Sequence, residues 1–103
     1  MEKEKEITVI EARDLIKSEK DLQLIDVRSA EAFAEYALPG FINIPLSRLS
    51  QEIPNLDGKK QTLIICNDGI LSYQALKLLE SCDINAKVIR GGHIDWKKII
   101  QNH

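Results

Sequence analysis

Cys66 is the residue of this sequence whose type and position point most directly to chemistry. It lies between an apolar run, Thr62–Ile65, and a segment with helical spacing, Ser72–Ser81. The first backbone N–H groups of a helix are unpaired and lie at the positive end of its dipole, so they stabilise an anion such as a thiolate or a persulfide. Gly69 lets the intervening loop adopt backbone angles closed to other residues, and successive N–H groups can then turn toward the sulfur. The pattern therefore predicts a nucleophilic cysteine in a cradle of backbone donors.

The loop that would form this cradle follows the cysteine directly. Its residues are Asn67, Asp68, Gly69, Ile70, Leu71 and Ser72. The loop contains no lysine or arginine, and Asp68 adds a negative charge, so the loop itself should not attract an anionic substrate. The local sequence also permits a second interpretation, in which Cys66 is a small buried hydrophobic residue that ends a strand. Gly69 favours the first interpretation.

The elements that must position Cys66 alternate along the chain. Short apolar or β-branched runs, typical of strands, are separated by segments with helical spacing. Strands are predicted over Ile7–Val9, Leu22–Val27, Phe41–Ile44, Thr62–Ile65 and Ala86–Ile89. Helices are predicted over 12–16, Ala30–Tyr36 with Ser29 as N-cap, Ser47–Ile53, Ser72–Ser81 and Ile94–Ile100, with a turn at Pro39-Gly40 and a surface loop at Pro54–Lys60. This alternation favours an α/β fold in which a parallel sheet is covered by helices on both faces.

Three groups of residues come at predicted strand ends, where ligands bind in parallel α/β sheets. They are Asp26 with Arg28, the Cys66 loop, and Arg90 with the two glycines that follow it. Asp26 and Arg28 could shape a pocket, but an ion pair or cap beneath the loops is the more ordinary role, with Glu31 as a further partner for Arg28. Arg90 either brings a cation to this rim or is solvated, and the second role is the more ordinary one.

The remaining candidate residues favour structural roles. Cys82, near a helix end, is expected to pack, because a helix rising roughly 1.5 Å per residue separates it from Cys66. His93 is expected to be an exposed loop residue, and Trp96 a core anchor. The chain has two cysteines and two histidines without the spacing of a metal site, so we expect no metal.

Length and composition limit the class of protein. The chain has 103 residues, 29% of them charged, and a net charge of −2. We therefore expect one domain over 1–103 and no basic surface for nucleic acid. No apolar run approaches the roughly 20 residues that span a bilayer. The charged stretch Met1–Glu6 lacks the apolar core of a signal peptide, so we expect a frayed N-terminus and a cytoplasmic protein without a membrane partner.

Several short segments occur in a particular order along the chain. They are Leu24–Arg28 (Leu-Ile-Asp-Val-Arg) followed by Glu31 and Phe33, Pro39–Leu46 (Pro-Gly-Phe-Ile-Asn-Ile-Pro-Leu), Cys66 with Gly69, and Gly91-Gly92 with Trp96. In this order and spacing they resemble the rhodanese homology domain over nearly the whole chain. The resemblance implies an open, parallel, five-stranded sheet with helices on both faces. It also implies that Cys66 takes a sulfane sulfur from thiosulfate or a persulfide, holds it as a persulfide and passes it to a thiol or cyanide, without a cofactor.

The chain also departs from the rhodanese pattern. Leu71 stands where active rhodaneses commonly carry Arg or Lys, and Tyr36-Ala37-Leu38 replaces the usual Gly-His-Ile. These changes predict weak activity toward thiosulfate, and they add a protein persulfide carrier to the expected partners. The alternative is a catalytically weak binding or regulatory module. A phosphatase of this fold is excluded, because Ser72 takes the place of the arginine that would hold a phosphate.

Overall fold

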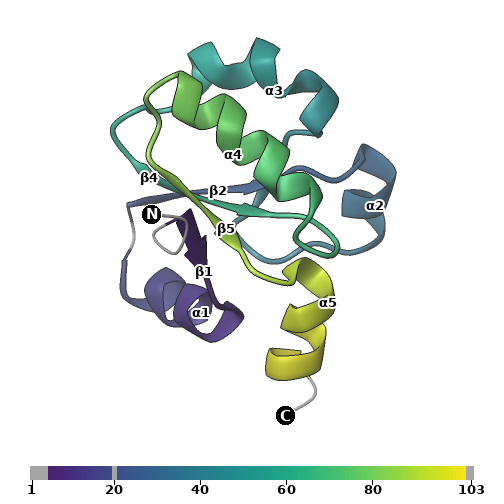
Figure 1. Ribbon diagram of the computed structural model, residues 1–103. Helices are drawn as coiled ribbons and strands as arrows, with labels where there is room; N and C mark the ends of the chain where they lie inside the picture. The colour runs from purple at the N-terminus through teal and green to yellow at the C-terminus, as the bar shows by residue number, and fades with distance from the viewer. Residues whose placement is uncertain (1–4, 20, 102–103) are drawn as a thin grey trace.

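The computed structural model describes residues 5–19 and 21–101, and Figure 1 shows its layered arrangement. Its strands are β1 (Glu6–Ile7), β2 (Leu22–Asp26), β3 (Ile42–Asn43), β4 (Gln61–Ile65) and β5 (Ala86–Ile89). They form one five-stranded sheet in the order β1-β5-β4-β2-β3, and every neighbouring pair is parallel. The prediction of an open, parallel, five-stranded sheet is confirmed.

Helices cover both faces of this sheet. They are α1 (Val9–Ser18), α2 (Ala30–Glu35), α3 (Leu46–Glu52), α4 (Leu71–Ser81) and α5 (Gly92–Trp96), with a 3₁₀ turn at Ile53–Asn55 and a π-helical segment at Lys97–Gln101. In Figure 1, α3 and α4 lie above the sheet, and α1 and α5 lie below it. The two layers of helices leave the carboxyl ends of β2 and β4 open to the loops that carry the candidate site.

The central strand β4 shows why two apolar layers form. Side chains alternate between the faces of a strand, so Ile64 belongs to the same core cluster as Leu79 of α4. Leu63 and Ile65 belong to the opposite cluster, together with Trp96 of α5, which is a core residue as predicted. A strand that is apolar on both sides is typical of the interior of a parallel sheet. The chain reaches Cys66 directly from this buried strand.

The chain enters its first helix earlier than predicted. The strand expected over Ile7–Val9 is wrong at its end, because β1 stops at Ile7 and Thr8 caps α1. The Thr8 side-chain oxygen accepts a hydrogen bond from the Glu11 N–H at 3.1 Å, and the Glu11 carboxylate accepts one from the Thr8 N–H at 3.0 Å. Thr-x-x-Glu is the sequence signal of this capping box. Hydrogen bonds to its carboxylate from the Thr8 backbone N–H and from the Thr8 side chain hold the pKa of Glu11 below its usual value.

Two other expectations about the chain's course need correction. Of the frayed segment expected over 1–6, residues 1–4 lie outside the described residues, whereas Glu6 belongs to β1 and Lys5 forms an ion pair with Glu80 at 2.5 Å. The surface loop expected over Pro54–Lys60 begins inside the 3₁₀ turn. Between residues 5 and 101, apart from residue 20, no helix is long and apolar enough to cross a membrane.

Candidate active site around Cys66

The sulfur of Cys66 lies among backbone donors. Cys66 is only 1% exposed, and its Sγ accepts hydrogen bonds from the Gly69 N–H at 3.1 Å and the Ser72 N–H at 3.3 Å. Gly69 has φ +92°, and a Cβ there would lie 2.9 Å from the Gly91 backbone nitrogen. The loop can therefore fold around the sulfur only with glycine at this position. The Ser72 hydroxyl is buried and has no hydrogen-bond partner among the described residues.

The first turn of α5 holds the other side of the same loop. The His93 N–H donates to the Cys66 carbonyl at 2.8 Å, and the Ile94 N–H donates to the Asn67 carbonyl at 2.9 Å. Gly92 lies against these carbonyls, and a Cβ on it would come within 2.2 Å of the Cys66 oxygen. The second glycine of the Gly91-Gly92 pair therefore allows α5 to dock on the cysteine loop, a role that its position after a strand did not reveal.

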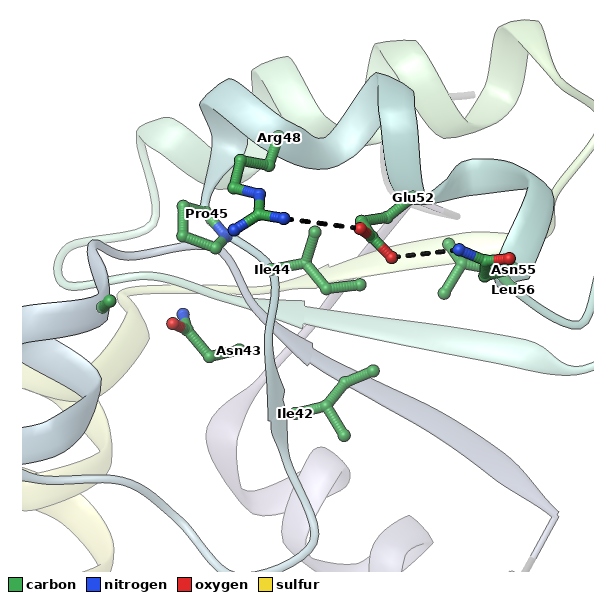
Figure 2. A pocket seen from close by; sticks show the side chains of 9 residues that line it. Ile42, Asn43, Ile44, Pro45, Arg48, Glu52, Asn55 and Leu56 are labelled. Atoms are coloured by element: carbon green, nitrogen blue, oxygen red, sulfur yellow. Dashed lines mark hydrogen bonds and ion pairs between the residues drawn. The ribbon is translucent and has the colours of Figure 1, made fainter.

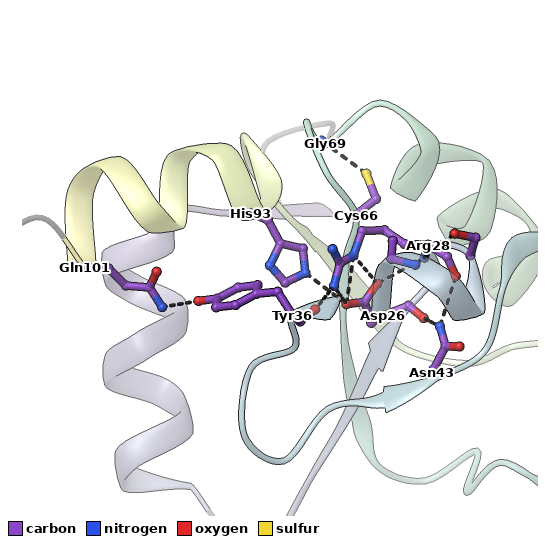
Figure 3. A network of polar contacts seen from close by, with 10 residues as sticks. Asp26, Arg28, Tyr36, Asn43, Cys66, Gly69, His93 and Gln101 are labelled. Carbon is purple, nitrogen blue, oxygen red and sulfur yellow. Dashed lines mark hydrogen bonds and ion pairs between the residues drawn. The ribbon is translucent and has the colours of Figure 1, made fainter. Parts of the chain in front are cut away.

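A buried charge network lies beside this loop, as Figure 3 shows. Asp26 is fully buried, and its carboxylate accepts hydrogen bonds from the Arg28 N–H at 3.0 Å and from the Arg28 guanidinium at 2.9 Å. The Nε2 of His93 lies 2.9 Å from Asp26 Oδ2, the same oxygen that the Arg28 guanidinium binds. Burial by itself raises the pKa of Asp26, but the hydrogen bonds from His93 and Arg28 outweigh it and hold the pKa below its usual value.

Two predictions about this network are wrong. His93 is not an exposed loop residue but a 1% exposed residue of α5, because this helix begins at Gly92 rather than at the predicted Ile94. Arg28 does not pair with Glu31. Its guanidinium binds Asp26 and donates to the Tyr36 carbonyl at 2.5 Å. Arg28 therefore lies between the end of β2 and the segment after α2, and it fixes both.

A pocket of about 450 Å³ opens above Cys66. Its walls are formed by Arg28, Ser29, Ala32, Cys66, Asn67, Asp68, Ile70 and Leu71. Asp68 Oδ1 accepts a hydrogen bond from the Ile70 N–H at 3.0 Å and lies 4.0 Å from the Cys66 sulfur. Arg90 does not line this pocket; its exposed side chain lies 3.9 Å from Glu6. Arg28, rather than Arg90, brings a cation to the site.

The other candidates lie apart from this pocket. A second pocket, of about 370 Å³, lies between β3 and α3, and Figure 2 shows that its Glu52 side chain contacts both Arg48 and Asn55. Cys82 is exposed at the end of α4, so the prediction that it packs is wrong. In the part of the chain that the structure describes, no three side chains are grouped so that they could hold a metal ion.

The fold and this site together define a class of protein. It is an α/β domain whose central parallel strand ends at a buried cysteine, with a short loop folded around the sulfur before the next helix. Residues 8–99 match the family model described as the rhodanese-like domain. The chain belongs to the rhodanese-like domain family, and the resemblance inferred from the sequence is confirmed.

Individual relatives agree with this assignment. The chain is 29% identical to YtwF of Bacillus subtilis (strain 168) over 93 residues, which cover 90% of each chain. It is 28% identical to the thiosulfate sulfurtransferase GlpE of Coxiella burnetii (strain RSA 331 / Henzerling II) over 94 residues, 90% of this chain and 87% of GlpE. A rhodanese-like domain protein from Staphylococcus aureus, known from its crystal structure, matches with a TM-score of 0.84 and 27% identity over 89% of this chain and 90% of that one. The chain spans half or less of several other curated relatives. Sulfur transfer is thus supported at the level of the family.

Proposed function

We propose that this protein is a sulfurtransferase that carries a sulfane sulfur on Cys66. The observation that carries the proposal is the position of Sγ, which accepts two backbone hydrogen bonds at the floor of a pocket. Fixed N–H donors stabilise an anionic sulfur. They suit both stages of the cycle, because the thiolate that attacks the donor and the outer sulfur of a persulfide are both anions.

The proposed cycle has two steps. The Cys66 thiolate attacks the sulfane sulfur of the donor, the donor's own bond to that sulfur breaks, and sulfite or a thiolate leaves with the electron pair. An acceptor thiolate or cyanide then attacks the outer sulfur of the persulfide, and the electron pair of the broken S–S bond returns to Sγ. The unpartnered Ser72 hydroxyl supports this scheme, since it is a free donor on the residue whose amide already binds the sulfur.

The charges of the pocket favour some donors over others. Asp68 repels a dianion such as thiosulfate, and the positive charge of Arg28 is already paired with Asp26. We therefore expect weak activity with thiosulfate and better transfer from less charged persulfides, a protein-bound persulfide among them. The name of one relative, thiosulfate sulfurtransferase, indicates a substrate used within the family. That name is not evidence that the Cys66 pocket binds thiosulfate.

Intact mass spectrometry tests the proposal. The protein is incubated with thiosulfate, with a small alkyl persulfide and with a protein persulfide, and we expect one added sulfur that a thiol acceptor removes. The added mass should be absent in Cys66→Ala and retained in Cys82→Ala. Sulfur on Cys82, or no transferable sulfur from any donor, would contradict the proposal and would favour a binding or regulatory module.

A further inference from the structure

We propose that the Cys66 pocket selects aminothiols as sulfur acceptors, that is, small thiols with a protonated amine two carbons from the sulfur. The inference rests on the proposed function and names the substrate class of its second step. It is drawn from the charges that face the pocket and from the position of Asp68 relative to Sγ.

The charges that line the pocket do not cancel. The Arg28 guanidinium is paired with the fully buried Asp26 and also binds the Tyr36 carbonyl. Asp68, by contrast, forms no ion pair with any residue between 5 and 101 that the structure describes. Its exposed carboxylate is held in place by the Ile70 N–H. One uncompensated negative charge therefore lies at the wall of the pocket, next to the reacting sulfur.

The position of this charge suits a particular acceptor. Asp68 Oδ1 lies 4.0 Å from Sγ, and the outer sulfur of a persulfide would project about 2.0 Å from Sγ into the pocket that Asp68 lines. The acceptor's sulfur must bond to that outer sulfur while the Cys66 S–S bond breaks and its electron pair returns to Sγ. An ammonium two carbons from the attacking sulfur can then face the carboxylate, and the apolar side chains of Ala32, Ile70 and Leu71 can cover the methylenes. A carboxylate on the same spacer would be repelled.

Three acceptors of similar size but different charge would show whether charge, rather than shape, determines which acceptor the pocket prefers. We would measure kcat/KM with cysteamine, 2-mercaptoethanol and 3-mercaptopropionate in the parent, in Asp68→Asn and in Asp83→Asn. Asparagine keeps the oxygen that accepts from the Ile70 N–H, so the loop can hold its shape. Asp83 is the matched control, because it is an exposed aspartate beyond the far end of α4, with φ +60°, where asparagine is tolerated. The intrinsic reactivity of each thiol cancels when one acceptor is compared across the three proteins.

We expect the ratio of the cysteamine value to the 3-mercaptopropionate value to fall about tenfold in Asp68→Asn. The 2-mercaptoethanol value should rise less than the 3-mercaptopropionate value, because the 2-mercaptoethanol thiolate carries one negative charge rather than two. The ratio should stay at the parent value in Asp83→Asn, and the difference should shrink as ionic strength rises. A ratio that is the same in the parent and in Asp68→Asn would overturn the inference while sulfur transfer itself still stood. Failure to transfer sulfur to any of the three thiols or to cyanide would overturn the proposed function and this inference with it.

Discussion

Two kinds of neighbour act on the charge of the Cys66 sulfur in opposite directions. The amides of Gly69 and Ser72 point at it from fixed positions, whereas the Asp68 carboxylate lies 4.0 Å away and is exposed. A fixed donor in a buried site interacts strongly, while water and salt screen the charge of an exposed carboxylate. An anionic sulfur at the floor of the pocket is therefore compatible with a repulsive charge at its wall.

The side chains of Asp68 and Leu71 at the wall of this pocket should also determine the KM for thiosulfate. Leu71→Arg would add a cation to the pocket, and Asp68→Asn would remove an anion. We expect each substitution to lower the KM for thiosulfate about two- to fivefold, because thiosulfate is a dianion that must approach a thiolate. Steady-state kinetics at low and high ionic strength would measure both effects, and both should shrink as salt rises.

A parent protein that already uses thiosulfate with a low KM, improved by neither substitution, would contradict this argument. The cation responsible would then be Arg28, which lines the pocket, rather than Arg90, which does not. In that case Arg90→Gln would leave the KM unchanged, which gives a control for any general effect of removing positive charge from the surface.

At the scale of elements, the docking of α5 on the Cys66 loop leaves no space for a side chain at Gly92. A Cβ there would overlap the Cys66 carbonyl, and φ is +58°. We expect Gly92→Ala to lower the free energy of unfolding by about 1–3 kcal/mol and to slow persulfide formation, because the carbonyl and the sulfur must both shift. Urea unfolding and intact mass spectrometry would measure the two effects.

Gly58→Ala is the matched control for this change. A Cβ at Gly58 would have no atom within 4 Å, and this glycine lies in a surface loop away from the pocket. The control should keep the parent's stability and reactivity. A Gly92→Ala protein that behaved like this control would show that the loop does not depend on α5.

The capping box at the start of α1 gives a second prediction for a single element. Thr8→Ala removes the oxygen that accepts from the Glu11 N–H, so we expect the free energy of unfolding to fall by about 1 kcal/mol. Glu11→Gln should cost less, because a glutamine side chain can still accept from the Thr8 N–H. Urea unfolding of the three proteins would decide, and equal losses in the two variants would contradict the capping explanation.

At the scale of the whole molecule, the network of Asp26, Arg28 and His93 links stability to pH. The pKa of Asp26 lies below its usual value in the folded state. Such a carboxyl stabilises the fold above its usual pKa of about 3.9, and the contribution is lost as pH falls through the lower folded pKa. We expect the parent's free energy of unfolding to decline as pH falls below about 4. Asp26→Asn should lack this part of the decline and should be about 3–5 kcal/mol less stable near pH 7, since it leaves Arg28 unpaired.

Urea unfolding at a series of pH values would test this prediction. Asp83→Asn serves as a control, because it removes an exposed carboxylate and should keep the parent's dependence on pH. If the free energy of unfolding fell equally steeply with pH below 4 in the parent and in Asp26→Asn, the Asp26 carboxyl would not be an important source of acid sensitivity.

Much of the architecture could be predicted from local pattern. The alternation of apolar runs and helical spacing indicated the parallel sheet, because the runs are short and the central one, β4, is apolar and buried on both faces. The loop after Cys66 could be placed for a similar reason: a strand end, a glycine and a helix start lie within a few residues of one another. The catalytic role of Cys66 stays a prediction.

Contacts between distant segments could not be predicted in this way. The sequence predicts an exposed loop position for His93, but its burial depends on where α5 begins. That start depends in turn on Gly91 at φ +76° and on the Cys66 and Asn67 carbonyls, each of which lies 27 positions before the N–H that it binds, that of His93 or Ile94. A histidine after two glycines gives no local indication that its side chain will contact the Asp26 carboxylate at the end of β2. The expected ion pair at Asp26 and Arg28 forms, whereas the expected pairing of Arg28 with Glu31 does not, because Asp26, two residues before Arg28, takes up the guanidinium.

The central place of β4 has a consequence for motion. Its amides are bonded between β2 and β5, and Leu63, Ile64 and Ile65 have no exposed surface. Backbone amides in such a strand exchange their hydrogens only when most of the molecule opens, whereas exposed loop amides exchange through local fluctuations. Cys66 is therefore joined on one side to the slowest-opening part of the chain and on the other to a loop that is partly exposed to water. Hydrogen exchange should rise at the exposed residues Asn67 and Asp68, while the Gly69 and Ser72 amides that bind the sulfur should stay protected.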